Sequence, residues 1–149
     1  MEHSLKYLVV PFVSMFAAQV IKFLIESHKA KKWMWGRLFN GSGGMPSSHT
    51  AFSFSLSIAL GIGEGFNSSL FSLGLIFALV TAYDSFNVRQ ESGKHAEILN
   101  DIAEEFFSKK GSKKKGINKL KESLGHKPLE VFCGALLGAV VATLIMLVF

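Results

Sequence analysis

A glycine- and serine-rich stretch, Gly41–His49, carries the residue types best suited to binding an anion. Its glycines let successive backbone N–H groups point into one concavity. Pro46 suits the first turn of a helix, and a loop that leads into a helix N-terminus is typical of a phosphate site. His49 adds a group that exchanges a proton near neutral pH. An interhelical loop whose serines only cap the helix is the alternative. The predicted phosphate-binding residues here are Gly43, Gly44, Ser47 and Ser48.

A second set of polar residues lies between, and at the facing ends of, two long apolar stretches of the chain, residues 66–84 and 128–149. Asp84, Arg89 and His95 come in that order, and His126 and Glu130 are four residues apart. On a closed helical turn the Glu130 carboxylate would hold one imidazole nitrogen and leave the other basic. The alternative is a histidine and a glutamate that only cap the helix.

These residue types suit phosphoryl transfer without a required cofactor. One histidine attacks phosphorus, a second protonates the leaving oxygen, and Arg and Lys neutralise the other oxygens. Asp84 would position a histidine or hold a cation. Because a carboxylate is a suitable ligand for Mg²⁺ or Ca²⁺, either ion is compatible with the site.

Four apolar runs must position these residues. Hydrophobic residues make up 49% of the 149 residues, and a bilayer span needs roughly 20 apolar residues in a helix. The sequence therefore predicts an all-α single domain, an integral membrane bundle of four transmembrane helices with short cytoplasmic interfacial helices. The predicted spans are 5–26, 46–64, 66–84 and 128–149, and the predicted cytoplasmic loops are 27–45 and 85–127.

The second of these loops contains two different segments. Leu99, Ile102 and Phe106 form an apolar stripe that predicts a short helix lying on the bilayer surface. Lys109–Lys121 is rich in lysine, glycine and serine, and we assign it to anionic lipid headgroups rather than to nucleic acid.

The charge distribution predicts the orientation. Of the 16 Lys and Arg residues, all but Lys6 lie in or beside the two predicted cytoplasmic loops. The positive-inside rule then places the chain in the inner (plasma) membrane with both termini outside. The site residues all lie at the cytoplasmic ends of the spans, where they can meet in one cavity. Lys22, one turn inside the first run, either enters that cavity or extends to the interface.

Small residues recur at four-residue spacing in two runs. Ser53, Ser57 and Gly61 lie in the second run, and Gly134 and Gly138 lie in the last. Such spacing lets helices approach closely in lipid. It predicts a compact bundle and is compatible with a homodimer.

Three motifs together give a resemblance to a known family. The GGMPSSH motif, the Asp84-x4-Arg89 element with Gly93 and Asn100, and LGHKPLEV are similar to the divergent type-2 phosphatidic acid phosphatase family. That family is related to acid phosphatases and vanadium-dependent haloperoxidases. The resemblance covers nearly the whole chain. It implies that His49 is a general acid and that Arg89 binds phosphate.

The sequence departs from the wider superfamily pattern at several positions. No Lys-x6-Arg-Pro element occurs, so Lys22 or Arg37 would replace it, and Val88 stands where a serine precedes the arginine. Arg89-x5-His95 is kept, but the His-x3-acid spacing recurs as His126 and Glu130. His126 is therefore the favoured nucleophile, with His95 as the alternative.

These patterns favour a membrane-embedded phosphatase of a lipid phosphate or pyrophosphate, acting at the cytoplasmic leaflet through a phosphohistidine. A membrane protein that binds lipid phosphate without turnover is the second hypothesis. A small transporter subunit is the third.

Overall fold

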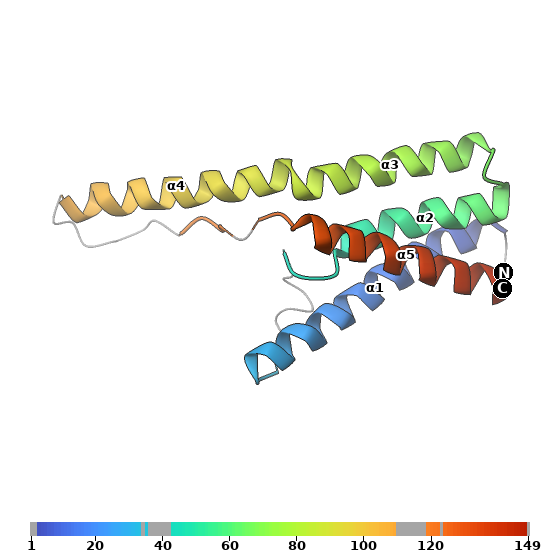
Figure 1. The fold of residues 1–149 in the computed structure, drawn as a ribbon, viewed down its shortest axis with the longest axis horizontal. Helices are drawn as coiled ribbons and strands as arrows, with labels where there is room; N and C mark the ends of the chain where they lie inside the picture. Colours follow the sequence, from blue (N-terminus) through green and yellow to red (C-terminus); the bar gives the residue numbers. More distant parts are fainter. Residues whose placement is uncertain (1–2, 34, 36–42, 110–118, 123, 149) are drawn as a thin grey trace.

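The computed structural model of the chain describes residues 3–33, 35, 43–109, 119–122 and 124–148. Its described secondary structure is helical, with no strand in those ranges. The helices are α1 (His3–Ala30), α2 (Ser48–Glu64), α3 (Ser69–Phe86), α4 (Val88–Lys109) and α5 (Pro128–Val148). Figure 1 shows α2, α3 and α5 side by side, with α1 crossing them at an angle.

Local side-chain caps fix where α2 and α3 begin. The Ser47 hydroxyl accepts the N–H of Thr50 at 3.4 Å, and the Ser68 hydroxyl accepts the N–H of Phe71 at 3.1 Å. Each cap satisfies one of the backbone donors that a helix N-terminus leaves without an intrahelical acceptor. Pro46 thus lies one residue before the cap rather than on the first helical turn as predicted, because Ser47 takes the cap position.

The central helix is α2, which packs against α1, α3 and α5. Two glycines of α5 make the closest approach: a Cβ at Gly134 would clash with the Ser47 carbonyl, and one at Gly138 with the Ala51 carbonyl. Gly74 of α3 comes similarly close, since its Cβ would lie 3.3 Å from the Ser57 Cα. The two α5 glycines, four residues apart, therefore bring α5 into close contact with α2, which agrees with the predicted compact bundle.

Three helices are long and apolar enough to cross a bilayer: Ser4–Ala30, Ser69–Phe106 and Pro128–Val148. These correspond to the first, third and fourth predicted spans. The predicted second span corresponds to α2, which has 17 residues and is not among the three. At about 26 Å, α2 is shorter than a hydrocarbon core of roughly 30 Å, so the described helices include three of spanning length and not the four predicted.

The predicted short surface helix was not confirmed. Instead α4 has 22 residues and continues the direction of α3 (Figure 1). The hydrogen-bond pattern runs through the junction, because Asn87 donates to the Tyr83 carbonyl at 3.0 Å and accepts from Glu91 at 2.9 Å. The 38 residues of Ser69–Phe106 would span about 57 Å, well beyond a hydrocarbon core of roughly 30 Å. The polar α4 therefore extends beyond the apolar part of the bundle.

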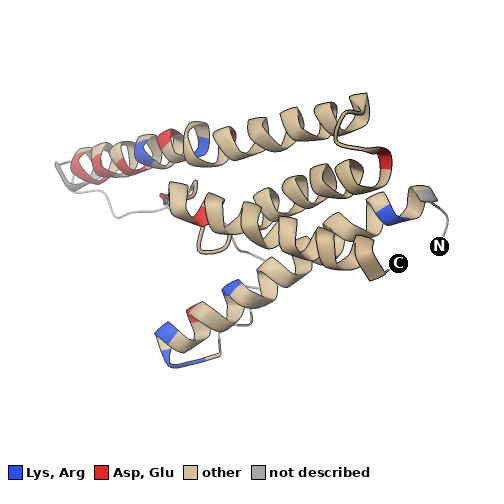
Figure 2. Ribbon diagram, turned by 45° about the vertical axis from the view of Figure 1, so that its right-hand side comes forward, with Lys and Arg blue, Asp and Glu red and all other residues tan. Residues whose placement is uncertain are grey.

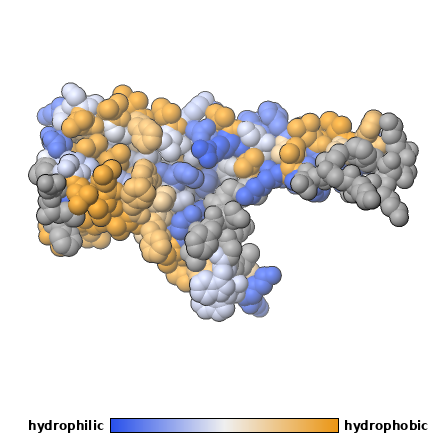
Figure 3. All heavy atoms as spheres, turned by 180° about the vertical axis from the view of Figure 1, so that it is seen from behind, coloured by the Kyte–Doolittle hydropathy of each residue, from blue (hydrophilic) through white to orange (hydrophobic). Residues whose placement is uncertain are grey.

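The two ends of the bundle differ in charge and hydropathy. Both chain termini lie at one end, whereas Lys and Arg gather toward the other, where α4 also carries many Asp and Glu residues (Figures 1 and 2). Hydrophobic side chains cover much of the bundle and reappear on α4, with hydrophilic ones between (Figure 3). The charged end is where the predicted site residues lie.

Candidate functional site

Four chain segments meet at the charged end of the bundle: the last turns of α1, the start of α2, the α3–α4 junction and the segment before α5. Two backbone hydrogen bonds join segments that are far apart in sequence. The Ser47 N–H donates to the Glu130 carbonyl at 3.0 Å, and the His126 N–H donates to the Ser85 carbonyl at 2.9 Å. These bonds bring the glycine-rich loop, Asp84 and His126 to the same end.

The described part of the glycine-rich loop packs against the end of α1. Gly43 and Gly44 have φ of 79° and 87°, a conformation that favours glycine. A Cβ at Gly44 would lie 2.6 Å from a Glu26 carboxylate oxygen and 3.5 Å from the Lys22 side-chain carbons. Lys22 is 0% exposed. It therefore lies inside the protein against the loop and does not extend to the interface.

His126 is the buried histidine of the site, at 6% exposure. Neither ring nitrogen has a hydrogen-bond partner among the described residues. Burial first, and then the nearby positive charges of Lys22, His49 and Arg89, lower the pKa of His126 from 6.5 to about 4. The imidazole is therefore neutral at physiological pH, the form that can attack phosphorus or accept a proton.

Glu130 does not hold the imidazole in this structure. Its carboxylate accepts the backbone N–H of Lys127 at 3.2 Å. As the third residue of α5, it reaches back to the residue just before the helix, near the N-terminus where the helix dipole favours a negative charge. The predicted orientation of His126 by Glu130 is corrected accordingly, and the capping alternative describes the observed contact.

Asp84 pairs with Arg89 rather than with a histidine. The Arg89 Nε donates to the Asp84 carboxylate at 2.5 Å, and the two side chains are 50% and 36% exposed. This pair lies at the α3–α4 junction. The Arg89 charge is close enough to affect the pKa of His126, so the pair lies at the outer side of the same site.

The serines and His49 occupy the first turn of α2 with different exposures. The Ser47 hydroxyl accepts both the Thr50 N–H and the Thr50 hydroxyl, so its contacts are those of a cap. Ser48 is buried, and His49 is exposed. Of the predicted phosphate ligands in this loop, Ser47 already uses its N–H within the protein, and its hydroxyl oxygen accepts two bonds from Thr50.

His95 is not brought to the other histidine. It is exposed on α4, whereas Gly93, Ala96 and Asn100 form the buried face of that helix. Of the two nucleophile candidates, His126 alone is buried beside Lys22. Arg37, the other residue predicted to replace the missing Lys-x6-Arg-Pro element, lies outside the described residues.

Glu26 was missed at the sequence level, and Asn100 was named there only as part of a motif, without a role. Glu26 lies one turn after Lys22 and reaches Gly44, and a Lys–Glu pair at i, i+4 near the end of an apolar run was the available signal. Asn100 holds the segment before His126 through its side-chain amide. No three His, Cys, Asp or Glu side chains in the described ranges are placed to hold a metal ion.

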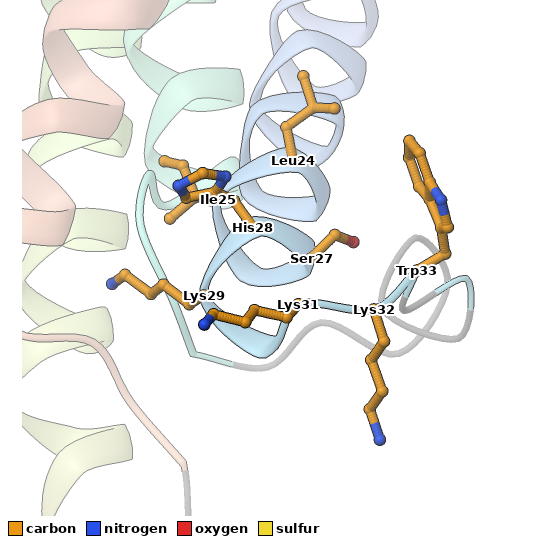
Figure 4. A pocket seen from close by; sticks show the side chains of 8 residues that line it. All are labelled: Leu24, Ile25, Ser27, His28, Lys29, Lys31, Lys32 and Trp33. Atoms are coloured by element: carbon orange, nitrogen blue, oxygen red, sulfur yellow. The ribbon is translucent and has the colours of Figure 1, made fainter.

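A pocket lies at the C-terminal end of α1, lined by Leu24, Ile25, Ser27, His28, Lys29, Lys31, Lys32 and Trp33. Figure 4 shows the lysine and tryptophan side chains extending in different directions rather than toward one point. Phe23, Trp33 and Trp35 stack on one another, with ring centroids 5.2 to 5.9 Å apart. This composition is typical of a membrane-interface anchor.

The fold and the site together define an all-helical membrane protein with a cationic polar cluster at one end. The chain belongs to the Divergent PAP2 family, whose sequence profile matches residues 3–141. It is 40% identical over 141 residues to the uncharacterised membrane protein YuiD of Bacillus subtilis (strain 168), which covers 89% of this chain and 87% of the relative. No solved structure matches the chain.

Proposed function

We propose that the protein is a membrane-embedded phosphatase that hydrolyses a lipid phosphate or pyrophosphate through a phosphohistidine on His126. The observation that carries this proposal is a buried, neutral imidazole whose two nitrogens have no partner in the described part of the chain. It lies beside the cations Lys22 and Arg89. Membership of the Divergent PAP2 family supports the same chemistry.

The reaction divides into two displacements. The lone pair of the His126 imidazole attacks phosphorus, and the bond from phosphorus to the lipid oxygen breaks while His49 donates a proton to that oxygen. Water then attacks the phosphohistidine and gives its proton to His49, and the P–N bond breaks to release phosphate. Lys22 and Arg89 neutralise the non-bridging oxygens in both steps.

The site is proposed to face the cytoplasmic leaflet of the plasma membrane. Lys and Arg gather at the end of the bundle that holds the site (Figure 2). The positive-inside rule places that end in the cytoplasm and both termini outside. Anionic lipids would concentrate beside the basic loops.

A phosphate-release assay on the purified protein in detergent tests the proposal. The substrates are phosphatidate, phosphatidylglycerophosphate, and polyprenyl phosphate and diphosphate, each with and without Mg²⁺ or Ca²⁺. His126→Ala should abolish release, whereas the exposed His95→Ala should retain it. Full turnover by His126→Ala would defeat the assignment, and loss only in His95→Ala would transfer the role to His95.

A binding protein without turnover is the second candidate. It is favoured because no carboxylate in the described ranges bonds to His126, since Glu130 and Asp84 have other partners. Lipid-phosphate binding that depends on Lys22, with no phosphate released under any metal condition, would select this candidate.

A further inference from the structure

The segment before His126 runs along α4 as an extended strap, defined here as residues 119–122 and 124–125. One α4 side chain holds its start. The Asn100 amide donates to the Leu120 carbonyl at 2.9 Å and accepts the Leu120 N–H at 2.9 Å. It also donates to the Glu122 carboxylate at 2.7 Å. Asn100 is 7% exposed, so these bonds are shielded from water.

Two glycines allow the strap to lie directly on the α4 backbone. A Cβ at Gly93 would lie 2.6 Å from the Glu122 carbonyl and 2.9 Å from the Leu124 carbonyl. A Cβ at Gly125 would lie 2.5 Å from the Gln90 backbone nitrogen, and Gly125 has φ of 87°. The contact therefore continues from Asn100 to the first turn of α4, with no space for a side chain at either glycine.

The strap ends at His126, whose N–H donates to the Ser85 carbonyl at 2.9 Å. No described side chain fixes the imidazole through a hydrogen bond, because both ring nitrogens are without a partner there. The position of the ring thus depends on the backbone that carries it. We infer that Asn100 is a positioning residue: it pins the strap to α4 and thereby sets the place of the His126 imidazole.

A general stabilising role would not account for these contacts. Of the other described helices, α4 contacts α3 alone. The packing among α1, α2, α3 and α5 does not involve Asn100, so its loss should leave the bundle folded. What α4 supplies through Asn100 is a fixed surface for the strap. The catalytic part of this inference rests on the proposed function, whereas the structural part does not.

The test compares Asn100→Ala and Asn100→Asp with the matched control Asp101→Ala, an exposed neighbour on the same helix. The first readout is the rate at which diethylpyrocarbonate modifies His126 near neutral pH, measured by peptide mass spectrometry. The exposed His95 serves as internal reference. Loss of the Leu120 bonds should make His126 react about tenfold faster in Asn100→Ala, with His95 unchanged. Asn100→Asp, which keeps one acceptor for the Leu120 N–H, should fall between, and Asp101→Ala should match the wild type.

The second readout is phosphate release. We expect Asn100→Ala to lower kcat by about tenfold or more with little change in KM, because the nucleophile is misplaced while the cations remain. Unchanged His126 reactivity in Asn100→Ala would overturn the inference, whereas faster modification with full kcat would overturn its catalytic part alone. If the wild type releases no phosphate from any lipid, the proposed function fails, and the modification rates still decide whether Asn100 places His126.

Discussion

The imidazole of His126 combines three properties that rarely occur together. It is buried, it has no hydrogen-bond partner among the described residues, and it lies near several positive charges. Each property favours the neutral ring, which is the reactive form of a histidine nucleophile. The lowered pKa also means that protonation of His126 opposes folding.

Acid should therefore destabilise the protein through this residue. The folded-state pKa is about 4 against 6.5 for an ordinary histidine, so the unfolded state binds the extra proton between these values. Stability is fully present above about pH 6.5 and falls as the pH drops toward about 4. The loss is of the order of 3 kcal/mol. Thermal unfolding in detergent should show this decline in the wild type and a smaller one in His126→Gln. Equal declines in both proteins would refute it.

At the scale of elements, the helix ends are fixed by caps and the helix contacts by glycines. The sequence allowed the helical class, the gathering of most site residues at one end and a compact bundle to be predicted, because these follow from apolar runs and small-residue spacing. The continuation of α3 into α4 could not be predicted, since Asn87 is compatible with either a break or a continued helix. The contacts of Glu130 and Asn100 also could not, because each depends on where a distant backbone segment lies.

The contact of α5 with α2 should be sensitive to one added methyl group. A Cβ at Gly134 would clash with the Ser47 carbonyl, which is backbone and cannot turn aside. Gly134→Ala should lower stability by about 1–3 kcal/mol and displace Ser47 at the start of α2. The control is Leu136→Ala, at an exposed position of the same helix. Thermal unfolding in detergent measures the stability of both variants. Equal stability of Gly134→Ala and wild type would contradict the close contact of Gly134 with the Ser47 carbonyl.

At the scale of the whole molecule, the bundle presents apolar helices to lipid and extends the polar α4 beyond them. The α2–α3 turn and the chain termini lie at one end, and α4 leaves from the other (Figure 1). We therefore expect the turn and α4 to lie on opposite sides of the membrane. On the positive-inside rule, the proposed cytoplasmic side is the one that carries α4.

Single cysteines test this arrangement in a Cys133→Ser background. Cysteine at Asn67, in the turn between α2 and α3, should react with a membrane-impermeant maleimide from outside intact cells. Cysteine at Glu97 on α4 should react only after the membrane is opened. Labelling of both from the same side would refute the opposite placement, and the reverse pattern would invert the proposed orientation.

The central claim is that His126 carries phosphate during turnover. The most direct measurement reacts the protein with ³²P-labelled phosphatidate or polyprenyl phosphate and stops the reaction without acid. Peptide mapping then locates the label. We predict an acid-labile, base-stable phosphate on the peptide that contains His126, present in His95→Ala and absent in His126→Ala. Phosphate released from the lipid with no label on His126, or with label on another residue, would contradict the account.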